Sequence, residues 1–310
     1  MKITILGGGS WGTALAVHLA GNGHEIKVWE FFEEQAREMQ EKRVCNLLPK
    51  VRLPSNIYVT HELNKALDDF ELVLIVVPSD KVEGLMENAK SFIKTQPVII
   101  CSKGFGSNSK LLSEVINGEV YCLYGPTHAE EVCKGMFSGI VLAGPDGRKK
   151  LAREIESDNF KVELSSDIIG VQVAAALKNI LAVFVGVLDG AGLGDNAKAY
   201  IMTKGLGEIK QVGLAFGGKE ETFYGLAGIG DMIVTCTSQH SRNRFVGQEV
   251  GKGRKLQEVI DEMKMVAEGV TTLKEAIKLK KQFNLTLPLI TGLYEILING
   301  KDVKEVLNSL

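Results

Sequence analysis

The sequence contains little cysteine and no excess of charge of either sign. Its five cysteines show none of the short spacings found in zinc sites or redox-active pairs, so we expect reduced thiols and no metal. Thirty-six basic residues stand against 38 acidic ones, for a net charge of -2. Nucleic-acid binding requires a concentration of Lys and Arg that this balance does not indicate, so we expect no nucleic-acid partner.

The sequence also lacks a charged-then-apolar leader and an uninterrupted membrane span. It opens on Met1-Lys2-Ile3, and its long apolar run, 171–188, carries Lys178 and Asn179 at its middle. A charge at that depth is costly in hydrocarbon. We therefore expect a cytoplasmic protein without stable membrane insertion, in which 171–188 is a buried helix.

What the sequence does contain is enough apolar mass for a large core. Of 310 residues, 45% are hydrophobic and 24% are charged, which excludes disorder, collagen and coiled coil. The length fits one large domain or two ordinary ones. The two halves of the sequence have different patterns, which favours two domains.

In the first half, 1–164, short β-branched runs alternate with helical patterns, as is typical of βαβ units and a mostly parallel sheet. The predicted strands are 3–6, 25–29, 72–77, 98–100, 120–123 and 139–142. Run 72–77 holds no charge, which suits a strand covered on both faces.

The second half, 165–310, is predicted to be all helical. Its expected helices include 168–188, 271–283 and 288–299, and glycine-rich breaks at 190–194, 217–218, 225–230 and 251–253 are expected to separate helices. The predicted fold class is therefore α/β: an N-terminal Rossmann-type doubly wound sheet that binds a dinucleotide, followed by a helical substrate-binding domain.

A glycine-rich motif, Gly7-Gly8-Gly9-Ser10-Trp11-Gly12, follows the first strand and opens helix 13–20. In such a motif Gly7 permits the tight turn, Gly9 lets backbone approach a pyrophosphate, and Gly12 lets the helix pack on the strand. The phosphates bind at the positive end of the helix. We therefore predict dinucleotide binding, although glycine turns without ligands exist.

Glu30 ends the second strand 18 residues past Gly12, where an acidic side chain accepts hydrogen bonds from ribose hydroxyls. A 2'-phosphate would meet negative charge there, because Phe31-Phe32-Glu33-Glu34 supplies no basic residue. Glu30 thus favours NAD over NADP. The alternative is that Glu30 merely opens the solvated helix 33–41.

Lys178 stands between Ala174-Ala175-Ala176-Leu177 and an equally apolar stretch after Asn179. Removal from water lowers the pKa of a lysine toward neutrality, as a proton donor and acceptor requires. The alternative is a lysine that pairs with an aspartate or extends to the surface. The residues alone leave these two interpretations open.

Other polar residues follow strands or glycines. Lys103 and the segment Gly125-Pro126-Thr127-His128-Ala129 each follow a predicted strand, at the edge where open α/β sheets bind ligands. The alternative for Lys103 is that it is an ordinary surface lysine, and the alternative for Thr127 is that it only caps a helix. We assign no role to His128.

In the second half, Asp231 follows three glycines and is a candidate site residue or a helix cap. The segment Ser241-Arg242-Asn243-Arg244 is a dense set of hydrogen-bond donors that suits binding of a phosphate group. The alternative is that Arg242 forms an ordinary ion pair at the surface.

Five segments taken together resemble a known enzyme family. They are GGGSWGTALA at 7–16, SKG at 102–104, GPTHAEEV at 125–132, AALKNILA at 175–182 and GIGDMIVTCTSQHSRNR at 228–244. They resemble NAD(P)-dependent glycerol-3-phosphate dehydrogenase, which interconverts dihydroxyacetone phosphate and sn-glycerol 3-phosphate. The resemblance spans essentially the whole chain, including 266–269 and Pro288.

The resemblance implies a homodimer without metal that uses NAD or NADP and supplies glycerol 3-phosphate for phospholipid synthesis. The glycine motif and the second strand predict cofactor contacts at Gly7, Gly9, Gly12 and Glu30, and the resemblance adds Ser10, Trp11, Phe31, Lys103, Ala129, Arg242, Val266 and Glu268. Substrate contacts are implied at Lys103, Gly125, Thr127, Lys178, Asn179, Asp231, Thr235, Ser241, Arg242 and Asn243, with Lys178 as general acid/base.

Phe31 stands where bacterial members often carry a basic residue, and this departure resembles the NAD-using eukaryotic members. Two other functions fit the residues less well. A dehydrogenase of another hydroxy acid or phosphorylated polyol would have less need of 241–244, and a nucleotide-sensing regulator would have no need of a lysine in an apolar helix.

Overall fold

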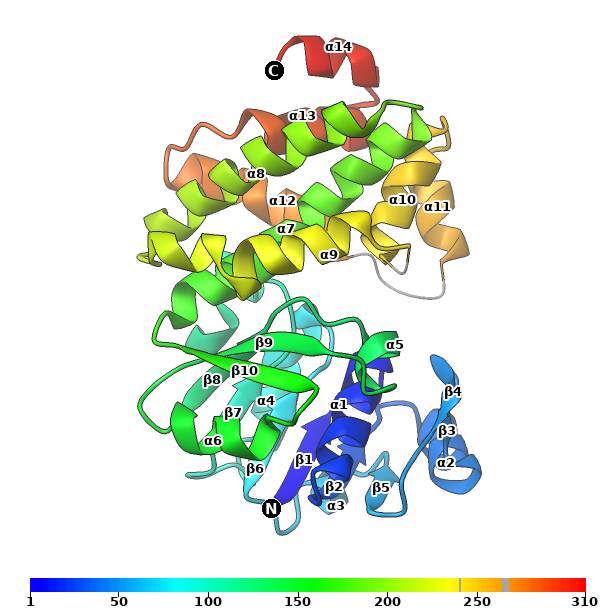
Figure 1. Cartoon of the computed structure of the whole chain (residues 1–310), viewed down its shortest axis with the longest axis vertical. Helices are drawn as coiled ribbons and strands as arrows, with labels where there is room; N and C mark the ends of the chain where they lie inside the picture. The colour runs from blue at the N-terminus through cyan, green and yellow to red at the C-terminus, as the bar shows by residue number, and fades with distance from the viewer. Residues whose placement is uncertain (240, 264–267) are drawn as a thin grey trace. The chain divides into compact units, whose positions relative to one another are not determined.

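The computed structural model describes residues 1–239, 241–263 and 268–310. They form two compact units (Figure 1). Unit 1 comprises Met1–Ser102 and Gly106–Ile168, and unit 2 comprises Lys103–Phe105 and Ile169–Leu310. The short insertion Lys103–Phe105 therefore belongs with the helices, although the chain on either side of it belongs with the sheet.

Unit 1 is built on an eight-stranded sheet in the order β10-β9-β8-β7-β6-β1-β2-β5. Its strands are β1 (Lys2–Leu6), β2 (Glu25–Trp29), β5 (Ile57–Thr60), β6 (Leu72–Ile75), β7 (Val98–Ile100), β8 (Val120–Tyr124), β9 (Ser138–Ala143) and β10 (Phe160–Ser165). A separate antiparallel pair consists of β3 (Val44–Cys45) and β4 (Leu48–Arg52). All pairs in the large sheet are parallel except β8 with β9.

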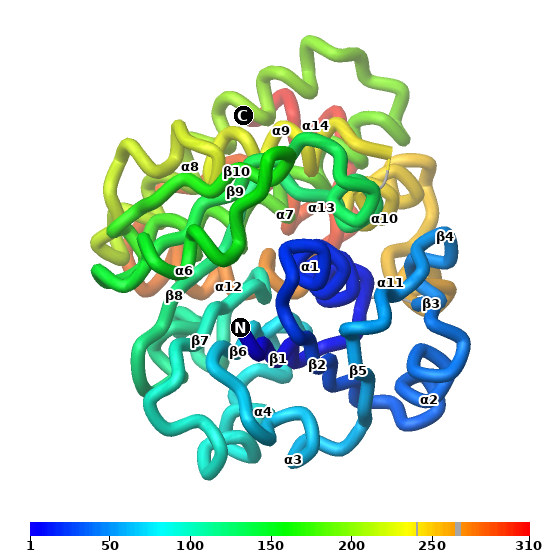
Figure 2. The backbone as a smooth tube through the Cα atoms, turned by 60° about the horizontal axis from the view of Figure 1, so that its bottom comes forward, coloured from blue at the N-terminus to red at the C-terminus, as the bar shows by residue number. Residues whose placement is uncertain are grey.

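Helices cover both faces of this sheet. They are α1 (Ser10–Gly21), α2 (Glu33–Lys42), α3 (Leu63–Ala66), α4 (Val82–Ala89), α5 (Ala129–Val132) and α6 (Arg148–Ile155). Helices α1 and α6 lie in front of the sheet in Figure 1 and α4 lies behind it, an arrangement that Figure 2 shows from another side. The predicted doubly wound fold is confirmed.

The buried apolar strands explain the topology. Every residue of β6 and β7 is buried, which is why these strands carry uninterrupted β-branched and leucine side chains instead of an alternating pattern. Strand order reverses between β1 and β6, and parallel sheets bind ligands at the carboxyl ends of strands at such a reversal. The glycine motif leaves β1 at that point.

Unit 2 is helical, as predicted, and α7 (Ile168–Gly190) forms its core. The other helices are α8 (Asp195–Ala215), α9 (Asp231–Thr237), α10 (Arg242–Gly251), α11 (Leu256–Glu262), α12 (Glu268–Gln282), α13 (Pro288–Asn299) and α14 (Val303–Asn308). Every residue of α7 from 170 to 188 is buried, so the prediction of a buried helix is confirmed. By length and composition alone α7 would suffice to cross a membrane, but 89% of its apolar window is buried inside the protein.

One predicted break is wrong over part of its length. Gly225 is extended and separates two helical segments, but Leu226–Gly230 is a π-helical turn that runs directly into α9. Gly228 serves close packing there, since an added Cβ would lie 2.2 Å from the Phe223 carbonyl oxygen. A glycine needed for close approach resembles a loop glycine in sequence.

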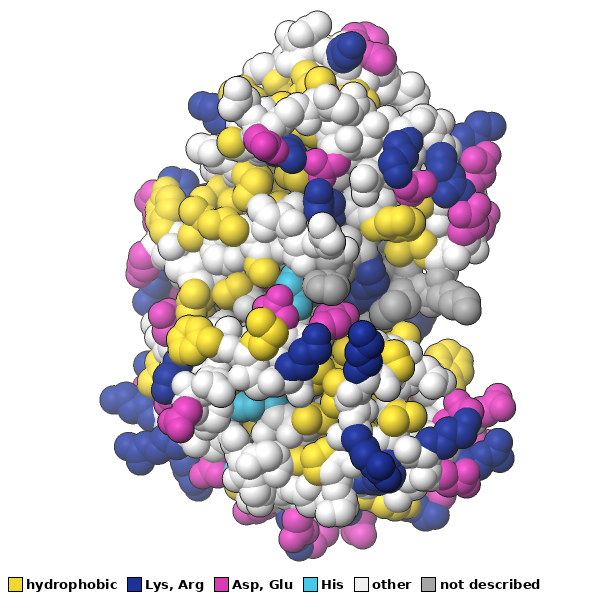
Figure 3. Space-filling model, turned by 45° about the vertical axis from the view of Figure 1, so that its right-hand side comes forward, with side chains coloured by type: hydrophobic (Ala, Val, Ile, Leu, Met, Phe, Trp, Pro, Cys, Tyr) yellow, Lys and Arg dark blue, Asp and Glu magenta, His cyan; other side chains and the backbone are white. Residues whose placement is uncertain are grey.

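Charges of both signs occur together on the one face of the surface that Figure 3 shows. On the face in Figure 3, Lys and Arg lie among Asp and Glu on each unit. Several ion pairs join residues three or four positions apart in the sequence, such as Lys42 with Glu38 and Lys252 with Glu249. Exposed pairs of this kind add solubility and little stability.

Candidate active site

Lys178, Asp231, Thr235 and Lys103 form one buried cluster within unit 2. The Lys178 Nζ donates to Asp231 Oδ1 at 2.5 Å and to Thr235 Oγ1 at 2.5 Å. The Lys103 Nζ donates to the other carboxylate oxygen, Asp231 Oδ2, at 2.8 Å. The Asp231 side chain is 1% exposed, Lys178 5% and Lys103 17%, so the carboxylate lies between two amines and is almost out of water.

Three segments that are far apart in the sequence build this cluster. Lys178 projects from the middle of α7, while Asp231 and Thr235 lie one turn apart on α9 and therefore on one helix face. The Thr235 hydroxyl also donates to the Asp231 carbonyl oxygen at 2.6 Å. Lys103 arrives from the insertion, where Phe105 stacks on Phe216 with ring centroids 6.1 Å apart.

The environment of Lys178 suits proton transfer. Burial is the main cause that lowers the pKa of Lys178, to about 8, against the opposing attraction of Asp231 and with the help of the neighbouring Lys103 charge. A pKa in this range lets one amine donate and accept protons near physiological pH. Lys178 thus pairs with an aspartate, as its alternative interpretation held, and has the lowered pKa as well.

Within residues 241–244, Ser241 and Arg244 make structural contacts, whereas Arg242 is exposed. The Ser241 hydroxyl caps α10 by accepting from the Arg244 backbone N–H at 3.3 Å. The Arg244 Nε donates to Asp189 Oδ2 at 2.6 Å, so Arg244 is held within the protein. Arg242 is exposed at the first turn of α10 and bonds to no other side chain in the described part of the molecule.

Asn179, Asn243 and Glu268 meet at the start of α12. The Asn179 Nδ2 donates to Glu268 Oε2 at 3.4 Å, and Asn243 Oδ1 accepts from the Gly269 backbone N–H at 2.9 Å. Gly269 is needed here, because an added Cβ would lie 2.5 Å from the Asn179 carbonyl oxygen. Val266, an expected cofactor contact, lies outside the described residues.

In unit 1 the glycine motif has the geometry of a phosphate-binding turn. Gly7 has φ +125°, which favours glycine, and an added Cβ would lie 2.8 Å from the Val76 carbonyl carbon. An added Cβ at Gly12 would lie 1.9 Å from the Gly7 carbonyl oxygen, whereas one at Gly9 would meet nothing within 4 Å. Gly9 therefore leaves space at the N-terminus of α1, where Ser10 and Trp11 begin the helix.

These features fit a dinucleotide. The 12-residue α1 presents unpaired N–H groups and a positive dipole end, which suit a pyrophosphate. The Trp11 indole Nε1 is buried and has no hydrogen-bond partner in the described part of the chain. A buried donor of this kind calls for an acceptor, which a bound ligand would supply.

Glu30 lies directly after β2 and is 6% exposed, so it is not the solvated start of α2. Its Oε1 accepts from the Phe32 N–H at 3.1 Å, and an added Cβ at Gly8 would lie 2.6 Å from Glu30 Oε2. Burial raises the pKa of Glu30, while hydrogen bonds from the backbone of Phe32, Gly8 and Phe31 oppose that rise. The carboxylate thus packs against the glycine loop, beside the exposed Phe31 ring.

Gly125, Thr127 and Ala129 follow β8, as predicted. Thr127 is not the N-cap of α5, because His128 holds that position and the Thr127 hydroxyl donates to the Gly125 carbonyl oxygen at 3.2 Å. Gly125 has a packing role, since an added Cβ would lie 2.9 Å from Ile140 Cα. Ala129 is buried at the start of α5.

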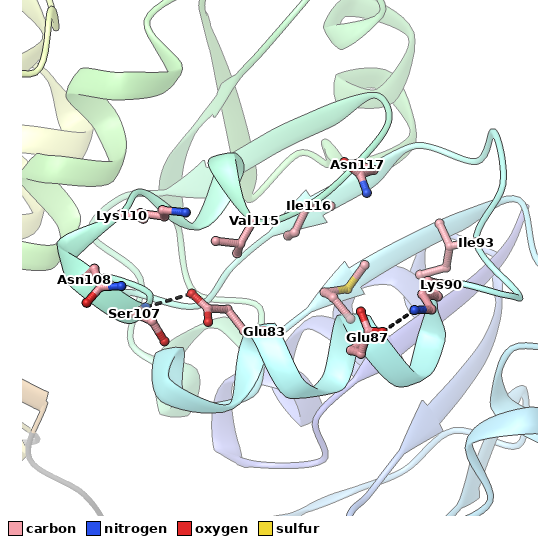
Figure 4. A pocket seen from close by; sticks show the side chains of 11 residues that line it. Glu83, Glu87, Lys90, Ile93, Ser107, Asn108, Lys110, Val115, Ile116 and Asn117 are labelled. Atoms are coloured by element: carbon pink, nitrogen blue, oxygen red, sulfur yellow. Dashed lines mark hydrogen bonds and ion pairs between the residues drawn. The ribbon is translucent and has the colours of Figure 1, made fainter.

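A separate pocket of about 410 Å³ in unit 1 contains none of the predicted site residues (Figure 4). It lies between α4 and residues 107–117. Glu83 on its wall accepts from the Ser107 N–H at 2.8 Å and so holds the chain just past the Lys103–Phe105 insertion. Sequence reasoning missed this contact and the roles of Asp189 and Phe105, because none lies in a recognisable motif.

Comparison with known proteins agrees with these observations. The family described as NAD-dependent glycerol-3-phosphate dehydrogenase N-terminus matches residues 2–150, and its C-terminus counterpart matches residues 167–308. Glycerol-3-phosphate dehydrogenase [NAD(P)+] from Bacillus cereus strain G9842 is 43% identical over 100% of this chain and 95% of its own.

Two solved structures have the same fold over nearly their whole length. Glycerol-3-phosphate dehydrogenase from Coxiella burnetii has a TM-score of 0.96 at 33% identity and covers 99% of this chain and 98% of its own. The enzyme from Saccharomyces cerevisiae has a TM-score of 0.87 at 27% identity, with the same coverage of 99% and 98%.

Proposed function

The chain belongs to the NAD-dependent glycerol-3-phosphate dehydrogenase family, and from this premise we propose that it reversibly reduces dihydroxyacetone phosphate to sn-glycerol 3-phosphate with Lys178 as general acid/base. The observation that carries this proposal is the buried Lys178–Asp231 pair with Lys103 on the second carboxylate oxygen. Burial of charged groups costs free energy, and buried charged groups with shifted pKa values cluster at functional sites.

A nicotinamide dinucleotide, when bound, supplies the hydride to C2 of the carbonyl substrate or takes it from C2 of the alcohol. Gly7, Gly9, Gly12 and the N-terminus of α1 would hold its pyrophosphate, and Glu30 its adenosine ribose. Either NAD or NADP is used by this family, and the buried Glu30 carboxylate supports a preference for NAD.

Lys178 would move the proton that accompanies the hydride. A lysine ammonium has three donors. In the described part of the chain two of them bind Asp231 Oδ1 and Thr235 Oγ1, which leaves one to donate to the substrate C2 oxygen. In the oxidation direction the neutral amine accepts that proton. Asp231 fixes the amine, and Lys103 adds positive charge where an alkoxide develops.

Arg242 would bind the substrate phosphate. Its guanidinium is exposed at the N-terminus of α10, where the helix dipole also favours an anion. Ser241 caps α10 and Asn243 lies in its first turn, while Asn179 lies in the middle of α7 and donates to Glu268 at the start of α12. Binding energy from the remote phosphate then places C2 at Lys178.

A spectrophotometric assay tests this function. Purified protein should oxidise NADH with dihydroxyacetone phosphate and should use NADPH less efficiently. Unphosphorylated dihydroxyacetone is the matched control and should be a much poorer substrate. Failure to oxidise either cofactor with dihydroxyacetone phosphate would overturn the proposal.

The family resemblance supports three further proposals: a homodimer, a cytoplasmic location, and supply of glycerol 3-phosphate to phospholipid synthesis. The five cysteines are free thiols, which suits a reducing compartment. Sedimentation of the purified protein tests the dimer, since a monomer mass would contradict it. A deletion strain tests the supply role, since growth without added glycerol 3-phosphate would argue against it.

A further inference from the structure

Asp189 and Arg244 connect the three helices that carry the proposed site. Asp189 lies near the end of α7, eleven residues after Lys178, or about 16 Å along the helix. Its Oδ2 accepts from Arg244 Nε at 2.6 Å, and its Oδ1 accepts from Lys198 Nζ at 2.9 Å. The Asp189 side chain is 12% exposed and Arg244 22%, so water screens this pair only in part.

Arg244 reaches a third helix with the rest of its guanidinium. Its Nη1 donates to the carbonyl oxygens of Thr237 at 3.3 Å and Ser238 at 3.4 Å. These carbonyls end α9, the helix that carries Asp231 and Thr235. Helix ends leave carbonyls unpaired, and a cation there satisfies them and complements the dipole. One arginine thus joins α7, α9 and α10.

The backbone around Arg242 is fixed on both sides. Ser241 caps α10 by accepting from the Arg244 N–H, so Arg242 lies between a cap and an anchored side chain. Helices α7 and α10 also pack with their backbones in contact. An added Cβ at Gly186 would lie 2.0 Å from the Arg244 carbonyl oxygen, and one at Gly247 would lie 1.9 Å from that of Val183.

We propose that Arg244 and Asp189 are positioning residues for phosphate recognition: they set the start of α10 so that Arg242 binds the substrate phosphate while Lys178 reaches C2. This inference rests on the proposed function. Neither residue is assigned contact with substrate. Their effect passes through Arg242, so their loss should impair phosphorylated substrates selectively.

The test compares Arg244→Lys with Arg254→Lys. Lysine keeps the charge but lacks the planar fork that joins a carboxylate to two carbonyls. Arg254, just past the end of α10, bonds to the carboxylates of Glu249 and Glu262 and is the matched control. For each variant the KM and kcat are measured with dihydroxyacetone phosphate and with dihydroxyacetone, at saturating NADH.

We expect Arg244→Lys to lower kcat/KM for dihydroxyacetone phosphate about 10- to 100-fold, since a displacement of about 1 Å can cost about 100-fold in rate. Turnover of unphosphorylated dihydroxyacetone should stay within about twofold of wild type. Arg254→Lys should leave both unchanged. Asp189→Asn, which keeps the shape of the side chain, provides a second variant if Arg244→Lys does not fold.

Equal proportional losses with both substrates in these variants, or no loss with either, would overturn the inference. Arg242→Ala separates this failure from failure of the proposed function. If Arg242→Ala impairs the phosphorylated substrate selectively and the Arg244 and Asp189 variants do not, only the positioning role is wrong. If Arg242→Ala itself shows no selectivity, phosphate binding by Arg242 fails and the positioning role fails with it.

Discussion

At the scale of single residues, the ionisation of Lys178 controls the proposed reaction. Burial and the neighbouring Lys103 charge lower its pKa to about 8, although Asp231 opposes them. Reduction of the ketone needs the protonated amine, so its rate should fall as pH rises through about 8. Oxidation of the alcohol needs the neutral amine, so its rate should rise through the same range. Rate profiles of kcat against pH in both directions check this prediction.

Lys103→Met provides a directional control for that profile. Removing the second amine removes one cause that lowers the pKa of Lys178, so the inflection should move to higher pH even though the overall rate falls. An inflection that stays in place would show that a different group limits the rate.

Glu30 determines the expected choice of cofactor. Its carboxylate is buried against Gly8, and a 2'-phosphate placed beside it would meet negative charge without a basic partner. Glu30→Ala should therefore lower kcat/KM for NADH and raise that for NADPH. The exposed Glu34, on the first turn of α2, is the matched control, and Glu34→Ala should change neither. A wild-type preference for NADPH would contradict this assignment.

At the scale of elements, glycines decide how closely helices pack. Gly247 on α10 lies against α7, and an added methyl group would lie 1.9 Å from the Val183 carbonyl oxygen. Gly247→Ala should destabilise the protein by about 1 to 3 kcal/mol, because α7 and α10 must separate.

Gly207 on α8 is the opposite case, with nothing within 4 Å of an added Cβ. Gly207→Ala should raise stability by about 0.5 to 1 kcal/mol, because alanine loses less backbone entropy in a helix. Thermal unfolding of the two variants measures both effects. A Gly247→Ala protein as stable as wild type would disprove the close contact.

The same elements show how far the sequence predicts this molecule. All six predicted strands are present, with β2 and β7 at the predicted bounds, because buried parallel strands carry long apolar runs. Strands β3, β4, β5 and β10 are not among the predicted strands. In β10 only Phe160 is buried and the rest is half-exposed or exposed, so its sequence lacks the apolar signal of a core strand.

The site was predictable in part, for a similar reason. Lys178 stands out as a charge in an apolar helix, and Asp231 follows a glycine cluster. Their pairing across 53 residues of sequence depends on how α9 packs on α7, which no local pattern encodes. Asp189, which lies in no motif, likewise determines that Arg244 is held within the protein while Arg242 stays exposed.

At the scale of the whole molecule, the insertion Lys103–Phe105 brings a residue from the first half of the sequence into the site of unit 2. It leaves the β-rich first half of the sequence and joins the helical unit, where Phe105 stacks on Phe216 and Phe216 contacts Phe283 with ring centroids 5.0 Å apart. This aromatic row holds the peptide that carries Lys103. Lys103 is thereby fixed on Asp231 from within unit 2.

Phe105→Ala should therefore lower kcat by about tenfold or more, because Lys103 loses its fixed position, while NADH affinity stays unchanged. Phe137, an aromatic side chain that is 73% exposed, is the control, and Phe137→Ala should leave kcat unchanged. Steady-state rates with NADH titrations measure both. A Phe105→Ala enzyme with wild-type kcat would show that Lys103 needs no such anchor.

The turnover of Lys178→Met tests the central claim most directly. Methionine matches the size of lysine in its apolar helix but carries no proton, so kcat with dihydroxyacetone phosphate and NADH should fall by about 10²- to 10⁴-fold. NADH should still bind, because its proposed contacts in the glycine motif are intact. Folded Lys178→Met protein that binds NADH and turns over dihydroxyacetone phosphate at nearly the wild-type rate would contradict the account.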